Sequence, residues 1–152
     1  RRRNSHYDRP EVDRRPSSPS KRVMHCYEDA IDNVVAHLKI EHDIDVVFDD
    51  DELGAYYHDA GIIGVNTNET LQEQLYVLLH EAGHAILKIE HKKYLETCDE
   101  TLQGKLSLLR EEMEAWKEGK ALAEDMGIPI NEGTWAMFCK QNLEDYIEWA
   151  TS

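Results

Sequence analysis

The sequence predicts an α+β fold in which a short three-stranded sheet packs on a central helix. β-branched and aromatic residues between Ile44 and Asn66 occur in runs that have the length of strands and are separated by turn residues. Apolar residues on both sides of this region recur instead at the spacing of amphipathic helices. A chain of 152 residues is long enough to bury one core and is expected to form a single domain over residues 23–152.

The region before the sheet is expected to contain one helix, over residues 28–41, whose apolar positions repeat at helical spacing. The first strand, over residues 44–48, ends at the acidic run Asp49 to Glu52. A solvated turn is favoured there over a cation site. Two further strands, 55–58 and 62–66, are expected to flank a hairpin turn that contains glycine.

Three helices are expected after the sheet. Asn68 or Thr70 can cap the first, which runs to about residue 90. The second covers residues 102–126 and ends at a Gly-Ile-Pro sequence, because glycine suits a helix C-terminus and proline cannot continue it. The last, over residues 133–149, carries bulky aromatic side chains that are typical of a core or an interface.

Residues 1–22 are expected to form a disordered basic tail. They contain three of the four prolines and few large apolar side chains, so they cannot bury enough apolar surface to fold. A tag, a linker or a misassigned start is favoured over an arginine-rich arm that binds an anionic partner.

The charge of the remaining chain is strongly acidic. Outside residues 1–22 there are 9 basic and 28 acidic residues, a net charge of −19. Such a body repels the phosphates of nucleic acids, so neither DNA nor RNA is an expected partner of the folded part.

The cysteines and the hydropathy pattern indicate a cytoplasmic protein. Cys26, Cys98 and Cys139 are an odd number, lie far apart and form no C-x-x-C pair, so they are expected to be reduced thiols. No apolar run has the length of a membrane span or the order of a secretory signal.

One short motif points to a chemistry. His80, Glu81 and His84 form an H-E-x-x-H motif in apolar sequence. At about 3.6 residues per turn, the two histidines lie one turn apart on one helix face, and Glu81 leans over the same side. Two neutral imidazoles so placed suit Zn²⁺, while the glutamate can take a proton from a metal-bound water. A chance match is the alternative, but it would more often fall on a polar surface helix.

A catalytic zinc needs a third protein ligand. The metzincin pattern is absent, because it requires histidine where Glu90 stands. In the next helix Glu112 has apolar residues as helical neighbours, whereas Glu111 and Glu114 have polar ones. A carboxylate on a buried stripe is costly unless it is paired or metal-bound, so Glu112 is the expected ligand. A glutamate that reaches the surface beside Trp116 is the alternative.

These residues resemble the ImmA/IrrE-like metallopeptidases, small intracellular zincins of the gluzincin type. The similarity covers about residues 44–126 and rests on three strands, an H-E-x-x-H helix and a glutamate 28 positions after the second histidine. Leu78 to His84 looks like the active helix of that family. Glu112-x-Glu114-Ala115 is similar to its E-x-E-A-N/D segment, in which the first glutamate is the third zinc ligand.

The resemblance implies a zincin-like fold, a Zn²⁺ ion held by His80, His84 and Glu112, and Glu81 as general base. It also implies that the substrate is a specific regulatory protein, such as a repressor or an antitoxin-like partner. One position departs from the family. Trp116 stands where asparagine or aspartate commonly supports a ligand histidine, so that supporting partner is missing or replaced.

The expected reaction is hydrolysis of a peptide bond by a water activated between zinc and Glu81. The strand over residues 62–65 is expected to pair with an extended substrate. Several side chains are candidates to stabilise the oxyanion, and the sequence does not choose among them: Tyr56, Tyr57, His58, Tyr76 and His91.

Two other functions stay open. One is a zincin-like binding module that recognises a protein partner without cleaving it, with Trp116 and the C-terminal helix forming the interface. The other is a helical domain without metal. Replacement of Glu81 by glutamine separates the first from the peptidase, and a metal assay tests the second.

Overall fold

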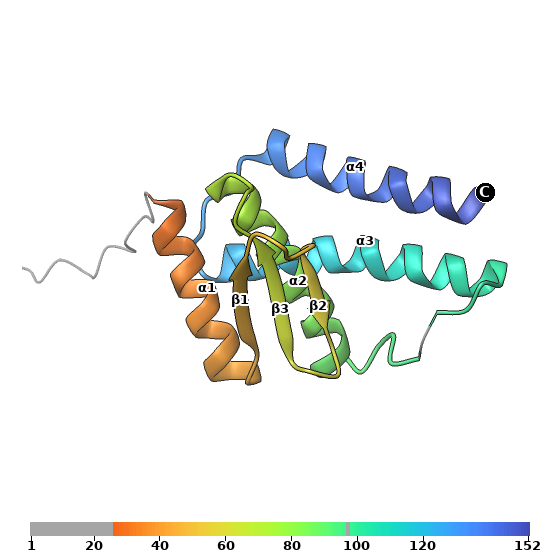
Figure 1. The fold of residues 1–152 in the computed structure, drawn as a ribbon, viewed down its shortest axis with the longest axis horizontal. Coiled ribbons are helices and arrows are strands. Elements are labelled where there is room, and N and C mark those ends of the chain that lie inside the picture. The colour runs from red at the N-terminus through yellow and green to blue at the C-terminus, as the bar shows by residue number, and fades with distance from the viewer. Residues whose placement is uncertain (1–25, 97) are drawn as a thin grey trace, which may run out of the picture.

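The computed structural model describes residues 26–96 and 98–152, so the expected tail lies outside the described part. These residues form the α+β fold that the sequence predicts, a small sheet with four helices (Figure 1). The elements are α1 (Tyr27–His42), β1 (Asp45–Asp49), β2 (Ala55–Tyr57), β3 (Ile62–Asn66), α2 (Leu71–Ile89), α3 (Leu102–Asp125) and α4 (Glu132–Thr151).

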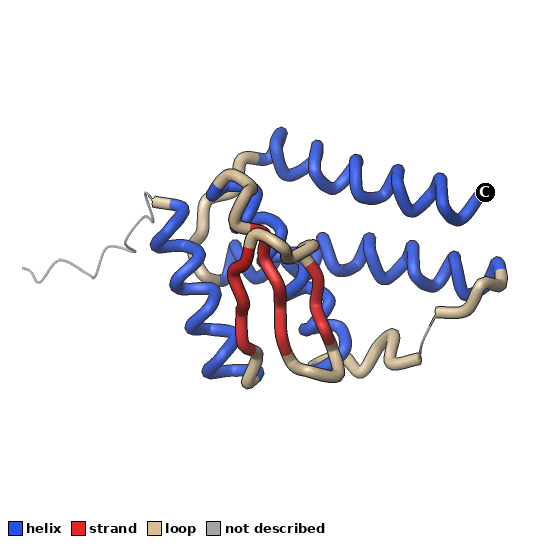
Figure 2. The backbone as a smooth tube through the Cα atoms, in the orientation of Figure 1, coloured by secondary structure: helices blue, strands red, loops and turns tan. Residues whose placement is uncertain are grey.

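The sheet has the strand order β1-β3-β2 (Figure 2). β1 runs parallel to β3. β2 runs antiparallel to β3, and the hairpin turn that joins these two strands contains Gly61, which has a φ of 63°. Because β3 is central, both of its edges are already paired. The expectation that this strand adds a substrate strand is therefore wrong, and within the described residues the free edges belong to β1 and β2.

α2 is the centre of the fold. Thr70, not Asn68, caps it, and its side-chain oxygen accepts a hydrogen bond from the Glu73 amide at 3.2 Å. Nearly every residue from Gln74 to Leu87 is buried, because the sheet, α1 and α3 all pack on this helix. A helix enclosed in this way is mainly apolar, and the buried polar or charged residues on it are Gln74, His80, Glu81 and His84.

The backbones of α2 and α3 approach closely at two glycines. A Cβ atom at Gly83 of α2 would collide with the carbonyl oxygen of Ala115 on α3. A Cβ atom at Gly119 of α3 would likewise collide with the carbonyl oxygen of Leu79. The two glycines therefore let the backbones approach closely at the level of the H-E-x-x-H motif.

α4 lies along α3 on the outer side of the molecule (Figure 1). Its N-terminus is anchored to α2, since the Tyr76 hydroxyl accepts a hydrogen bond from the Asn131 amide at 2.9 Å and the Tyr76 and Trp135 rings pack edge to face. Among the described helices, none is both long and apolar enough to cross a membrane.

Candidate metal centre

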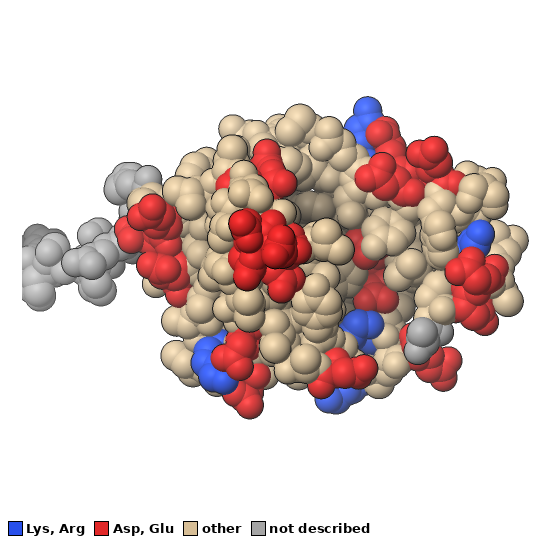
Figure 3. Space-filling view, in the orientation of Figure 1, with Lys and Arg blue, Asp and Glu red and all other residues tan. Residues whose placement is uncertain are grey.

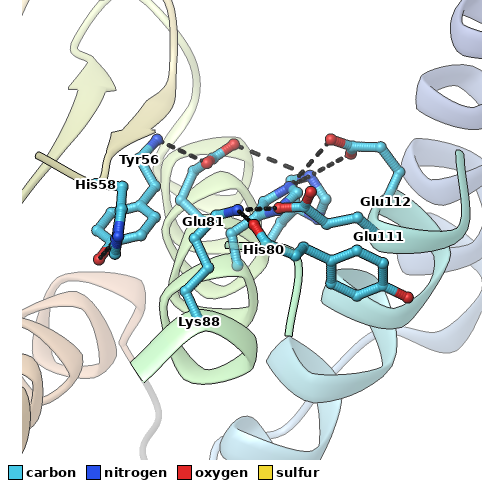
Figure 4. Close-up of polar contacts among 9 residues, drawn as sticks. Tyr56, His58, His80, Glu81, Lys88, Glu111 and Glu112 are labelled. Atoms are coloured by element: carbon cyan, nitrogen blue, oxygen red, sulfur yellow. Dashed lines mark hydrogen bonds and ion pairs between the residues drawn. The ribbon is translucent and has the colours of Figure 1, made fainter. Parts of the chain in front are cut away.

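Three buried side chains direct nitrogen and oxygen atoms at one point between α2 and α3 (Figure 4). His80 Nε2 and His84 Nε2 lie 3.3 Å apart. Glu112 Oε2 lies 3.0 Å from the first of these nitrogens, and Glu112 Oε1 lies 3.1 Å from the second. The side chains that the sequence singles out as ligands are thus brought together by the crossing of the two helices.

The spacing of these atoms suits a zinc ion. Ligand distances of about 2.0–2.1 Å in a tetrahedral site place neighbouring ligand atoms about 3.3–3.4 Å apart, close to the separations observed here. Glu112 Oε2 is buried and receives no hydrogen bond from the described residues, although it touches a histidine nitrogen. A buried oxygen without a hydrogen bond is costly, and a cation would satisfy it. The residues present therefore fit the metal.

The three side chains form one electrostatic cluster. Burial opposes the charged form of Glu112, but its close contacts with the imidazoles of His80 and His84 lower the pKa of this carboxyl to about 2. Burial also opposes the charged form of His84, but hydrogen bonds to Glu111 and Glu112 raise the pKa of the imidazole to about 10.

The described residues contain a second group of side chains close enough to share a metal ion, Asp49 to Asp51. This group is exposed, as expected for a solvated turn.

Glu81 lies next to the three candidate ligand side chains on α2 and α3, and its carboxylate is within 4.8 Å of ligand atoms of both histidines. Its Oε2 accepts a hydrogen bond from the Tyr56 backbone amide of β2 at 2.8 Å, while its Oε1 is 3.9 Å from His80 Nε2. Burial raises the pKa of this carboxyl, although the nearby histidines act in the opposite direction. A carboxylate with a raised pKa next to a candidate metal site has the properties of a general base.

Glu111 corrects the sequence analysis, which places it on the polar face of its helix. Its side chain is 11% exposed, and Oε1 lies 3.0 Å from both His84 Nδ1 and Lys88 Nζ. The polar neighbours of Glu111 are those on α3 itself, whereas its real surroundings come from α2 across the interface. A carboxylate on the far ring nitrogen of a ligand histidine fixes the orientation and tautomer of that ring. The feature of the sequence that could have indicated a carboxylate beside His84 is Lys88, a cation that lies one helical turn after this histidine.

Trp116 supports the other histidine in a different way. Its ring stacks on the His80 ring, with centroids 4.2 Å apart and planes inclined by 21°. The indole nitrogen donates a hydrogen bond to Asn142 Oδ1 of α4 at 2.9 Å. His80 Nδ1 has no hydrogen-bond partner among the described residues. At this position, then, aromatic packing takes the place of the asparagine or aspartate of the family pattern.

A cavity of about 630 Å³ opens over the cluster and is lined by Glu81, His84 and Glu112. Of the side chains considered for the oxyanion, only Tyr56 lines it. Tyr146 of α4 also lines this cavity, and sequence reasoning missed it because nothing near it in the chain marks a site. Burial, the charge of Glu112 and a hydrogen bond to it raise the pKa of Tyr146, which keeps the hydroxyl protonated.

The remaining oxyanion candidates are engaged elsewhere. Tyr76 is 1% exposed and holds Asn131, as a buried tyrosine would. The Tyr57 hydroxyl donates a hydrogen bond to Glu52 at 3.1 Å, and His91 lies on the surface, 3.5 Å from Glu118. His58 bonds the Tyr56 hydroxyl at 3.3 Å.

The chain matches the sequence profile of the IrrE N-terminal-like domain, peptidase family M78, over residues 40–119. The match includes the sheet, α2 and most of α3, and so contains His80, Glu81, His84 and Glu112. No curated protein and no solved structure matches the chain significantly. The function that this family implies is of the zinc metallopeptidase type. On the profile match and the buried His80-Glu81-His84 cluster, the chain belongs to the IrrE N-terminal-like peptidase family.

Proposed function

We propose that this protein is a zinc-dependent endopeptidase that cleaves a peptide bond in a specific cytoplasmic regulatory protein. The observation that carries the proposal is the convergence of His80, His84 and Glu112, because two of these side chains, His84 and Glu112, line a cavity that Glu81 also lines. An accidental H-E-x-x-H sequence gives no reason for a third ligand atom to meet both histidines. The cytoplasmic location rests on the three free cysteines.

In this proposal His80, His84 and Glu112 hold the zinc ion. When bound, zinc polarises the scissile carbonyl and makes water a nucleophile near neutral pH. Glu81 accepts the proton of the attacking water and passes it to the amine of the leaving peptide. Its carboxylate lies 3.9 Å from His80 Nε2 and lines the cavity, so it is placed for both steps.

Tyr146 is the proposed donor to the charge that develops on the scissile carbonyl oxygen. It lines the same cavity as Glu81 and His84. A hydroxyl already placed at the point where charge develops costs no reorganisation during the reaction. Tyr56 is the alternative donor on the other side of the cavity.

The edge of β2 is the proposed site for an extended substrate segment. The Tyr56 amide points out of the sheet toward Glu81, so this edge borders the cavity directly. A peptide that adds to the edge would lie across the candidate metal centre, with its side chains alternating between cavity and solvent.

The experiment that tests the function compares the wild type with Glu81→Gln. Both zinc-loaded proteins are incubated with a peptide library from digested cell lysate, and new termini are counted by mass spectrometry. We expect cleavage by the wild type alone and about one equivalent of zinc in both proteins. Equal cleavage by the two proteins would refute the peptidase proposal.

The same samples address the other two functions. A binding module would leave the peptides uncut while both proteins retain zinc and bind a common partner. A helical domain without metal would hold well under one equivalent of zinc after zinc supplementation.

A further inference from the structure

α4 is poorly covered for a helix with so many large apolar side chains. Of its 20 residues only Trp135 is buried. Met137 and Ile147 are 48% and 47% exposed, and Leu143 is half-buried. α4 packs on α3 along one side, which leaves Met137 and Ile147 in contact with solvent. An apolar surface of this kind commonly marks a site of protein interaction.

A groove of about 540 Å³ runs between α3 and α4. Its walls are mainly apolar, and the residues that form them are Met113, Trp116, Trp135, Cys139, Leu143 and Ile147. Two facing helices with an apolar floor between them have the shape that accepts a third helix, whose side chains enter at helical spacing.

The charge around this groove is opposite to that of the rest of the body. Lys117, Lys120 and Lys140 line it, three of the nine basic residues outside residues 1–22, while Glu144 is the one acidic residue among the lining residues described. Elsewhere acidic side chains predominate, as on the face in Figure 3. A cluster of lysines on so acidic a body favours an anionic partner.

The lysines are available to such a partner. Lys117 is exposed and makes no ion pair within the described residues. Lys140 lies 3.7 Å from Glu144, and both side chains are more than half exposed. Lys120 pairs with Glu132, whose side chain is 70% exposed. Exposed pairs of this kind contribute little to stability, so a better-placed carboxylate can replace them.

We propose that the groove between α3 and α4 binds an amphipathic helix of a partner protein, whose apolar stripe is flanked by aspartate or glutamate. The apolar stripe fills the groove and the acidic flanks meet Lys117, Lys120 and Lys140. The basic residues 1–22 of the chain itself have the wrong charge for this surface. A second copy of the chain is disfavoured by the net charge of the body, which repels itself at long range.

The test uses two synthetic helical peptides with the same leucine stripe, one flanked by glutamate and the other by lysine. Binding to the full-length chain is followed by tryptophan fluorescence, because Trp116 and Trp135 line the groove. Protection of Cys139 from alkylation locates the peptide, and exposed Cys26, which does not line the groove, is the internal reference. We expect the acidic peptide to bind at least tenfold more tightly than the basic one and to protect Cys139 alone.

A matched pair of variants tests the charge argument. Lys117→Glu should weaken binding of the acidic peptide about fivefold to tenfold, as expected for loss of one charge contact and gain of a repulsive one. Lys92→Glu makes the same change at an exposed residue outside the groove and should leave binding unchanged. Raising the salt concentration should weaken binding of the acidic peptide to the wild type.

Four results would overturn the proposal. Equal binding of the two peptides would contradict the proposed charge complementarity. Binding of neither peptide would contradict the proposed helix-binding site. A concentration-dependent dimer that Ile147→Asp abolishes would assign the groove to a second copy. A carbodiimide cross-link from Lys117 to Glu11 of the same chain would assign it to the basic N-terminal residues.

Discussion

The carbonyl oxygen of Ala115 on α3 lies directly against Gly83 on α2, which is the second variable position of the H-E-x-x-H motif. Neither residue carries a candidate ligand atom. Their contact nevertheless sets the distance between the helices, and with it the reach of Glu112 toward the two histidines. The candidate metal centre therefore depends on backbone packing as much as on its ligands.

Gly83→Ala tests that dependence. Alanine normally stabilises a helix interior by about 1 kcal/mol relative to glycine. Here we expect the opposite sign, because the added methyl group must push α3 away, and overpacking costs about 1–3 kcal/mol. Urea unfolding measures the free energy, and competition with a chelator measures the loss of zinc affinity.

Gly133→Ala is the control for that substitution. A Cβ atom there would have Asn131 Oδ1 at 3.6 Å as its nearest neighbour, so the methyl group has room. We expect unchanged or slightly higher stability and unchanged zinc affinity. A Gly83→Ala protein that behaved like Gly133→Ala would contradict the close-packing argument.

Glu111→Gln should weaken zinc binding without abolishing it. The amide cannot hold His84 as the carboxylate does, and loss of such a supporting partner typically costs about 10-fold to 100-fold in metal affinity. Glu112→Gln, which alters a proposed ligand, should cost more. Glu114→Gln is the matched control, since Glu114 contacts Lys93 and not the histidines. If Glu111→Gln and Glu114→Gln had equal zinc affinity, the role of Glu111 would be disproved.

Tyr146→Phe should lower kcat about 100-fold to 1,000-fold, the range for loss of one oxyanion donor, and leave zinc content unchanged. KM should change little, because the hydroxyl acts on charge that develops in the transition state. Tyr56→Phe provides the comparison from the other wall of the cavity. A larger loss of kcat in Tyr56→Phe would transfer the role to Tyr56.

Trp116→Ala should destabilise the protein by about 3–5 kcal/mol, because it removes a large side chain that is 5% exposed. It should also weaken zinc binding, since the stack on His80 is lost. Trp116→Phe keeps a stacked ring and should retain most of the zinc affinity. Asn142→Ala removes only the hydrogen bond to the indole, and a loss of zinc affinity equal to that in Trp116→Ala would show that the stack is unimportant.

Local patterns in the sequence predict most of the fold, and they single out the three side chains that the structure brings together between α2 and α3. The strands, the four helices and the cap at Thr70 follow from periodicity, turn residues and capping chemistry, all of which act over a few residues. The motif itself places His80 and His84, and the apolar face of its helix singles out Glu112.

The errors have one physical origin, since each concerns a contact between distant parts of the chain. Glu111 has polar neighbours on α3 itself, but its side chain contacts His84 of α2 where the two helices cross. Tyr146 reaches the cavity only because α4 turns back along α3. β3 precedes the motif helix in the chain, yet the strand order gives the free edge to β2. Helical faces and strand propensities contain no information about such pairings.

The position of Trp116 links the two surfaces of this molecule. Its ring stacks on His80 on one side and also borders the groove between α3 and α4. An occupant of the groove that shifts this ring must change the affinity of the metal centre, and zinc must then change the affinity of that occupant by the same factor. In the two proposals taken together, the indole of Trp116 therefore couples the binding of zinc to the binding of a partner helix.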